Sequence, residues 1–346
     1  MLQKFPGNLR YIVSLLVISI VAISIRIYCF RGFIGLDDAE YAKFAYQISQ
    51  GSFSVGDYLG PAVFPLRVGL TFPTAFLFQF FGVSEWTMVL YPLFLSVFGI
   101  FLVYFCTAHL FNNRAGLIAA FFWAILPIDL VNSTKLLPDG PASFYASLGA
   151  VCLIIFIRSE LKKKFPLLLG GILVGLLFGF SWLCKELVAY YVPFCLCLFF
   201  LTIKNNWQRD LYLWIGIAIG STGILLSEMS IYYSLTGDWM FRFHEIERNY
   251  KQCLDGFFFK GSRWGWQTGG DYSQALLNRL FVTGPKMIFF NNQFLYLPLL
   301  GLLASLVALY RKDKSFLFPA VWLITLCLMF NFASSSLSNS TFGDAT

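Results

Sequence analysis

The sequence predicts an all-α fold, a polytopic membrane helix bundle that crosses the bilayer about nine times. The chain of 346 residues is 58% hydrophobic, 19% aromatic and only 12% charged, and its mean hydropathy is +0.69. A soluble domain could not cover so much apolar surface. Lys and Arg cluster in short segments between the apolar runs, as the positive-inside rule expects. Cytoplasmic loops therefore explain the net charge of +7, and no nucleic-acid partner is expected.

The expected spans alternate across the bilayer from a cytoplasmic N-terminus. Lys4 and Arg10 precede the first span, which predicts that the N-terminus lies inside. Alternation then puts the basic loops around Arg114, Arg158 and Arg209 on the cytoplasmic side as well. The expected spans are 11–30, 87–107, 115–131, 141–157, 166–183, 187–203, 211–233, 294–310 and 316–333.

The whole chain, 1–346, is expected to form a single membrane domain, with spans within 11–233 and 294–333. Outer loops are expected at 31–84 and 234–292. The second loop holds Trp264 and Trp266, which suit either an anchor at the membrane interface or a platform for stacking on a sugar.

The first outer loop contains two expected interfacial helices. In the first, apolar side chains recur at i, i+3, i+4 and i+7, a pattern typical of an amphipathic helix in the interface plane. Gly51 supplies its stop. The apolar positions are Tyr41, Phe44, Ala45 and Ile48, and the polar ones are Glu40, Lys43, Gln47 and Gln50. A second and more apolar helix is expected over 67–81.

The stretch from Gly35 to Tyr41 is the most unusual part of the chain. Asp37, Asp38 and Glu40 fall within four residues, although only 12% of the chain is charged. Asp is a preferred helix N-cap, so capping alone could explain one of the two aspartates but not both. We therefore expect the chemistry of the protein at this stretch, with Glu40 as a residue of the polar face.

The expected topology brings three further charged clusters to the same outer face: Arg67, then Lys135 with Asp139, then Lys185 with Glu186. Acids and bases at the mouth of a membrane bundle suit a phosphate-bearing, lipid-attached substrate. Basic groups would hold the phosphate, and a carboxylate could act as general base or metal ligand. A divalent cation bound between Asp37 and Asp139 is an alternative role for these two carboxylates.

Each cluster also has a purely structural interpretation. Asp139 lies in a Pro-Asp-Gly-Pro turn and could cap the next span. Lys185 and Glu186 could form a solvated hairpin or neutralise each other. Arg67 could extend its guanidinium to the lipid headgroups.

Other polar residues give weaker signals. Seven of the eight cysteines lie in or beside apolar runs and no CxxC pair exists, so neither a disulfide framework nor a metal site is expected. His244 does not begin an HExxH zinc motif. Glu228 lies inside an expected span, where a carboxylate is costly in lipid, and should face the bundle or an aqueous cavity.

Four stretches carry a resemblance to a known family: residues 35–41, 81–85, 110–116 and 136–139. In their order and spacing, the chain resembles bacterial and archaeal glycosyltransferases of the protein mannosyltransferase and aminoarabinose transferase superfamily, which has the GT-C membrane fold. The resemblance covers about residues 11–195.

The resemblance implies an activity and roles for several residues. Such enzymes transfer a sugar, with inversion, from a polyprenyl-phosphate carrier to a glycan, lipid or protein acceptor outside the cytoplasm. It implies that Asp37 and Asp38 are the catalytic pair, with Asp37 as the base or the group that orients the acceptor and Asp38 in support. It also implies that Lys185, with Glu186 beside it, and Asp139 contact the substrate. Arg67 and Lys135 are expected substrate-binding residues of the same face.

The chain departs from its relatives at two points. Asp38 stands where Glu is commoner, which shortens that side chain by one methylene. The chain also ends after about nine spans, where relatives usually continue, which predicts a short or truncated C-terminal part.

The resulting hypothesis is an inverting glycosyltransferase of the plasma (inner) membrane, with its active site outside the cytoplasm and no certain cofactor. One rival is a secondary transporter, which predicts ionisable residues near the midplane and broken spans in matched halves. The other is a non-catalytic relative that only binds polyprenyl phosphate.

Overall fold

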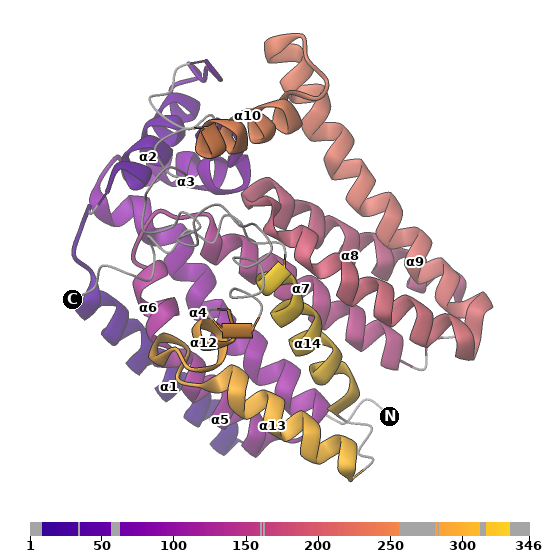
Figure 1. Cartoon of the computed structure of the whole chain (residues 1–346). Helices are drawn as coiled ribbons and strands as arrows, with labels where there is room; N and C mark the ends of the chain where they lie inside the picture. Colours follow the sequence, from indigo (N-terminus) through magenta and orange to yellow (C-terminus); the bar gives the residue numbers. More distant parts are fainter. Residues whose placement is uncertain are drawn as a thin grey trace. The chain divides into compact units, whose positions relative to one another are not determined.

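The computed structural model describes residues 9–33, 35–56, 63–159, 161, 163–255, 281–282, 284–311 and 316–332 (Figure 1). Within these ranges every regular element is a helix, which confirms the all-α membrane fold. Five helices are long and apolar enough to cross a membrane by length and composition. They are Leu9–Cys29, Glu85–Leu110, Asp139–Arg158, Lys164–Cys184 and Trp207–Thr236. Shorter apolar helices accompany these five. Trp264 and Trp266, the expected interface anchor or sugar platform, lie outside the described residues.

The chain divides into two compact units. The first combines Met1–Ala189 with Leu196–Arg242, and the second combines Tyr190–Cys195 with Phe243–Thr346. The residues expected to carry the chemistry all lie in the first unit.

The first unit is built on antiparallel packing of its spans. Its helices are α1 (Leu9–Cys29), α4 (Glu85–Leu110), α5 (Asn113–Ala124), α6 (Pro127–Asn132), α7 (Asp139–Arg158) and α8 (Lys164–Cys184). α4 packs against α1, α5 and α7, and α7 packs against α8. The expected span at 115–131 is instead two helices, because α5 ends at Ala124 and Pro127 starts the short α6. Proline lacks the N–H that would continue the helix.

Helix α9 (Val192–Thr236) has helical backbone along its whole length but folds back on itself. The rings of Phe199 and Trp214 lie 5.4 Å apart, and Trp214 Nε1 donates to Thr202 Oγ1 at 3.3 Å. In a straight helix, residues 12 apart would be separated by about 18 Å. α9 therefore forms two antiparallel limbs, as Figure 1 shows, in agreement with the expected spans 187–203 and 211–233.

Glycines set the contact between α8 and the second limb of α9. A Cβ added at Gly171 would lie 2.1 Å from the carbonyl oxygen of Leu213, and one at Gly175 would lie 2.3 Å from that of Ile217. No side chain fits at these distances, so the two backbones touch directly. Small residues spaced four apart commonly allow such close packing between membrane helices. The contact holds the middle of α8 against the second limb of α9.

The two expected interfacial helices are present. α2 (Leu36–Ser49) buries Tyr41, Phe44 and Ala45 on one face and ends before Gly51, whose φ of +67° suits glycine. After the 3₁₀ helix η1 (Phe64–Leu66) comes α3 (Val68–Phe81), which packs against α2 and α8. A Cβ at Gly69 would lie 2.7 Å from Cys184 Sγ. This close approach brings the start of α3 to the end of α8.

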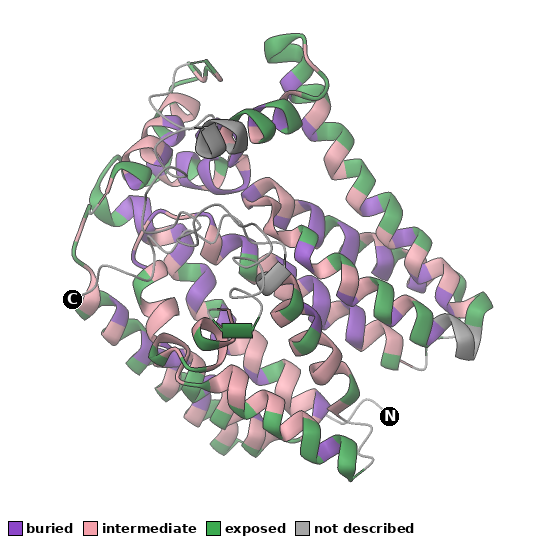
Figure 2. Cartoon of the chain, in the orientation of Figure 1, coloured by how far each residue is buried: buried purple, intermediate pink, exposed green. Residues whose placement is uncertain are grey.

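Many large apolar residues of the spans are exposed, and Figure 2 marks the exposed positions in green. Leu16, Ile20 and Ile27 of α1 are each half exposed or more. Faces of this kind suit contact with lipid, where the backbone polar groups are satisfied within the helices.

The second unit contains shorter apolar helices. α12 (Gly284–Phe289) contacts α13 (Leu297–Tyr310) and α14 (Leu317–Phe332), which pack against each other. α13 and α14 correspond to the expected spans 294–310 and 316–333. α10 (Phe241–Asp255) begins at the end of the first unit and continues into the second.

Candidate active site

An ion pair joins two of the predicted site residues at one end of the bundle. Lys185 follows the last residue of α8 in extended backbone, and Asp139 lies in the first turn of α7. Because α7 and α8 are antiparallel neighbours, these helix ends meet. Lys185 Nζ donates to Asp139 Oδ1 at 2.7 Å, and both side chains remain partly exposed, at 26% and 40%. Asp139 is not a helix cap, since the N-cap of α7 is Pro138.

Asp37 lies beside this pair. It is an exposed residue of the first turn of α2, but protein atoms crowd its carboxylate. This crowding raises the pKa of Asp37 above its usual 3.8; the charge of Lys185 opposes the rise, and that of Asp139 adds to it. The three side chains are thus close enough to influence one another electrostatically. We call Asp37, Asp139 and Lys185 the open cluster.

The carboxylate of Asp37 accepts no hydrogen bond from any residue that the structure describes. Gly35 is the N-cap of α2, so neither Asp37 nor Asp38 caps the helix, and the capping interpretation is wrong for both. Asp38 is buried, with 5% of its surface exposed. Asp37 is therefore the aspartate of this turn that is open to a substrate.

Glu40, one turn further along α2, is half buried. Its Oε2 atom is buried without a hydrogen-bond partner in the described part of the chain. Lys135 lies in the loop between α6 and α7 and is also half buried, with no ion pair to any described residue. Its predicted contact with the substrate stays a prediction.

Arg67 and Glu186 bind each other. The Arg67 guanidinium donates to both carboxylate oxygens of Glu186, once at 3.0 Å and once at closer range. Burial alone would raise the pKa of Glu186, but the charge and hydrogen bonds of Arg67 lower it to about 2. Arg67 is only 3% exposed, so it does not extend to the lipid headgroups.

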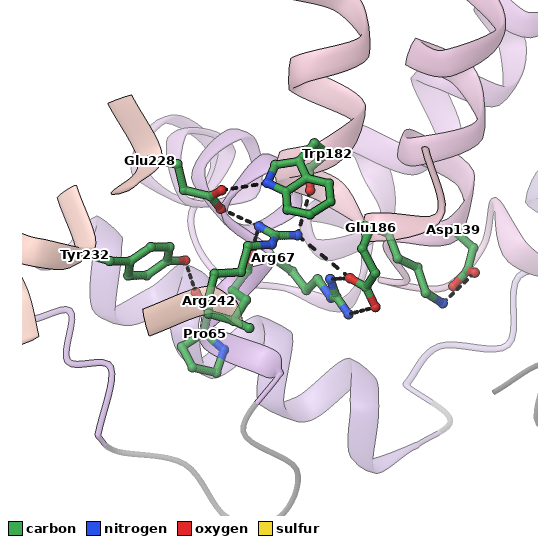
Figure 3. Close-up of polar contacts among 10 residues, drawn as sticks. Pro65, Arg67, Asp139, Trp182, Glu186, Glu228, Tyr232 and Arg242 are labelled. Atoms are coloured by element: carbon green, nitrogen blue, oxygen red, sulfur yellow. Dashed lines mark hydrogen bonds and ion pairs between the residues drawn. The ribbon is translucent and has the colours of Figure 1, made fainter. Parts of the chain in front are cut away.

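A second buried pair adjoins the first (Figure 3). Arg242, in the first turn of α10, binds Glu228 of α9, and Trp182 Nε1 donates to the other oxygen of Glu228 at 2.7 Å. Arg242 also lies 3.8 Å from a Glu186 oxygen. We call Arg67, Glu186, Glu228 and Arg242 the sealed network. Glu228 faces the protein interior, as expected for an acid within a span.

Sequence reasoning missed Arg242 because it lies in a long outer segment that is rich in basic residues. The available signal was Glu228. An acid inside a span needs a cation, and Arg242 is near the start of the segment that follows the span.

The open cluster does not form a cation site by itself. No group of three His, Cys, Asp or Glu residues able to hold a metal occurs in the described parts of the chain. Asp37 and Asp139 are neighbours, but the Lys185 ammonium already occupies an oxygen of Asp139. Divalent cations such as Mg²⁺ and Ca²⁺ require more oxygen ligands than these two side chains supply.

The apolar helices indicate a multi-pass membrane protein, and the two clusters gather ionisable residues at one end of its spans. The model of the dolichyl-phosphate-mannose-protein mannosyltransferase family matches residues 69–227. This match bears out the resemblance to the protein mannosyltransferase and aminoarabinose transferase superfamily, a group of glycosyltransferases that in general use polyprenyl-phosphate sugars. No curated protein and no solved structure gives a significant match.

The matched region contains only part of the two clusters. Asp139, Lys185 and Glu186 lie within it, whereas Asp37 and Arg67 precede it. It ends one residue before Glu228. The roles of these residues therefore rest on geometry and chemistry.

Proposed function

We propose that this chain is an inverting glycosyltransferase that moves a sugar from a polyprenyl-phosphate carrier to an acceptor outside the cytoplasm. The acceptor would be a glycan, a lipid or a protein. The family match supports the general class. The observation that carries the proposal is the open cluster, in which an aspartate without a described hydrogen-bond partner lies beside a lysine–aspartate pair.

In the proposed reaction, Asp37 takes the proton of the acceptor hydroxyl as that oxygen attacks the anomeric carbon. The bond between this carbon and the phosphate oxygen breaks, and the polyprenyl phosphate leaves with the electron pair. Attack from the face opposite the leaving group inverts the configuration. The raised pKa of Asp37 suits this role, because a carboxylate with a higher pKa is a stronger base.

In this proposal, Lys185 stabilises the phosphate as it leaves. Its ammonium contacts Asp139, and a phosphate that binds here would compete with Asp139 for it. The phosphate is the group on which negative charge grows, so a fixed cation beside it would act mainly in the transition state. Arg67 and Glu186 are engaged with each other, so we assign them a supporting place beside this site rather than a phosphate contact.

Basic residues at the opposite end of the bundle support a site outside the cytoplasm. Arg209 donates to the carbonyl oxygens of Phe156 and Ser159 at the end of α7, and Arg158 lies in the same helix end. Short loops with Lys and Arg usually lie on the cytoplasmic side. The open cluster would then face outward, so that the lipid tail stays in the bilayer while the sugar meets its acceptor.

The decisive test is Asp37→Asn in membranes supplied with labelled polyprenyl-phosphate sugars. Loss of the base should lower the transfer rate by about 10²- to 10⁴-fold. Glu85→Gln is the matched control, because it removes an exposed acid from the first turn of α4 at the same end of the bundle. Undiminished transfer by Asp37→Asn would contradict the assignment of Asp37 as the catalytic base.

The same experiment separates the rivals. Uptake driven by an ion gradient, without glycosyl transfer, would favour a transporter. A transporter would use an ionisable acid within the membrane, but its candidate in this chain, Glu228, already forms an ion pair with Arg242. Binding of polyprenyl phosphate without turnover by the wild-type chain would favour a non-catalytic relative.

A further inference from the structure

Arg242 is the residue of the sealed network with the most partners. Its guanidinium binds Glu228 and donates to the carbonyl oxygens of Leu66 at 3.1 Å and Trp182 at 2.7 Å. It also stacks 4.6 Å from the centre of the Trp182 ring. Arg242 thereby connects η1, the end of α8, the second limb of α9 and the start of α10.

Two residues that Arg242 contacts, Trp182 and Glu186, lie on either side of Lys185 in the chain. Trp182 is three residues before Lys185, and Glu186 directly follows it. Trp182 belongs to the last turn of α8, whose carbonyl groups have no partner within the helix. One nitrogen of Arg242 donates to the Trp182 carbonyl and lies 3.8 Å from Glu186 Oε2.

We propose that Arg242 and Glu228 are positioning residues, which hold the Trp182 backbone before Lys185 and the Glu186 carboxylate after it, and so aim the Lys185 ammonium at the site. Neither residue would contact the reacting atoms. Glu228 fixes Arg242, and Arg242 fixes the segment from Trp182 to Glu186.

The physical cost of the pair favours this interpretation over a purely stabilising one. Arg242 and Glu228 side chains are each 2% exposed, and Arg242 Nε is buried without a hydrogen-bond partner in the described chain. Removing two charges from water is costly, and apolar side chains of similar volume often stabilise a core as well or better. A costly pair with directional bonds is better explained by the geometry that it imposes on Lys185.

The chain offers a matched control for the test. Arg209 also donates to carbonyl oxygens at the end of a span and also has an acidic partner, Asp210. It does so at the end of α7, away from Lys185. Arg209→Lys and Asp210→Asn therefore make the same chemical changes as Arg242→Lys and Glu228→Gln.

The first measurement does not depend on turnover. The purified full chain is treated with an amine-acylating reagent, and labelling of Lys185 relative to the exposed Lys163 is quantified by mass spectrometry. Arg242→Lys and Glu228→Gln should raise labelling of Lys185 several-fold, because its contact with Asp139 loosens. The two control variants should leave it unchanged. Wild-type labelling of Lys185 in both test variants would overturn the proposal.

The second measurement rests on the proposed function. Misplacing Lys185 should lower kcat by about 10- to 100-fold, with a smaller change in KM for the lipid-linked donor, because Lys185 acts mainly on the transition state. Glu228→Gln keeps the size of the native side chain and one of its two acceptor oxygens, so it tests the proposal even if Arg242→Lys does not fold. Equal losses of kcat in test and control variants would contradict positioning. A wild-type chain without any transfer would defeat the proposed function alone, and the labelling result would still decide this proposal.

Discussion

The open cluster and the sealed network lie side by side, yet they treat charge in opposite ways. In the open cluster, Lys185 and Asp139 keep 26% and 40% of their side-chain surface, and Asp37 accepts no described hydrogen bond. In the sealed network, Arg242 and Glu228 keep 2% each and Arg67 keeps 4%, while Glu186, the residue next to the open cluster, keeps 21%. The two cations and two anions of the sealed network balance.

The difference separates residues that can exchange partners from residues that cannot. A partly exposed ion pair is weak and can give way to a charged ligand. A buried pair loses much more when one partner leaves, since the remaining charge is left without solvent. The open cluster is thus suited to chemistry, and the sealed network is suited to hold the helix ends that carry it.

The largest expected effect concerns the stability of the sealed network. Arg67→Met leaves Glu186 without its bidentate partner and should lower the free energy of unfolding by about 3–5 kcal/mol. The double variant Arg67→Met with Glu186→Met removes both charges and should recover much of this loss. Thermal unfolding of the detergent-solubilised protein measures both variants. A double variant no more stable than the single one would show that the pair is not sealed.

Lys185→Met should instead affect catalysis far more than folding. Loss of a cation that stabilises the leaving phosphate should lower kcat by about 10²- to 10³-fold. Its partly exposed contact with Asp139 contributes little to stability, so the unfolding temperature should hardly change. Lys185→Arg keeps the charge and should retain part of the activity. A large loss of folded protein in Lys185→Met would contradict the distinction between the two regions.

The open cluster was predictable because topology determines which helix ends meet. Alternating spans put the segments around Asp37, Asp139 and Lys185 on one face, and the structure brings these three side chains together. Periodicity predicted α2 equally well, since the spacing of Tyr41, Phe44 and Ala45 marks its buried face.

The pairing of charges within that face was not predictable. Arg67 and Glu186 were both expected to contact the substrate, but they lie 119 positions apart and bind each other. Arg26 was missed altogether. It is completely buried in α1, where it donates to Ser96 at 2.8 Å and to Asp129 at 2.5 Å. Such pairs depend on how helices rotate about their axes, which a hydrophobic pattern determines only loosely.

The smallest expected effect is a shift in the pH dependence of transfer. Asp37 must be ionised to act as a base, so kcat/KM should fall as the pH drops through its pKa. Because that pKa is raised, the fall should begin above the usual 3.8. Asp139→Asn removes a negative charge that raises the pKa of Asp37, and it frees Lys185, whose charge lowers the same pKa. Both changes act in one direction, so the acidic limb of the pH profile should move to lower pH.

The control for this shift is Glu85→Gln, an exposed acid at the same end of the bundle that does not influence the pKa of Asp37. Its acidic limb should coincide with that of the wild-type chain. A shift to higher pH in Asp139→Asn would mean that Asp139 does not act on the base through its charge. The contacts of Asp139, which is 40% exposed, would then be as fixed as those of the sealed network. The distinction between the two regions would not hold.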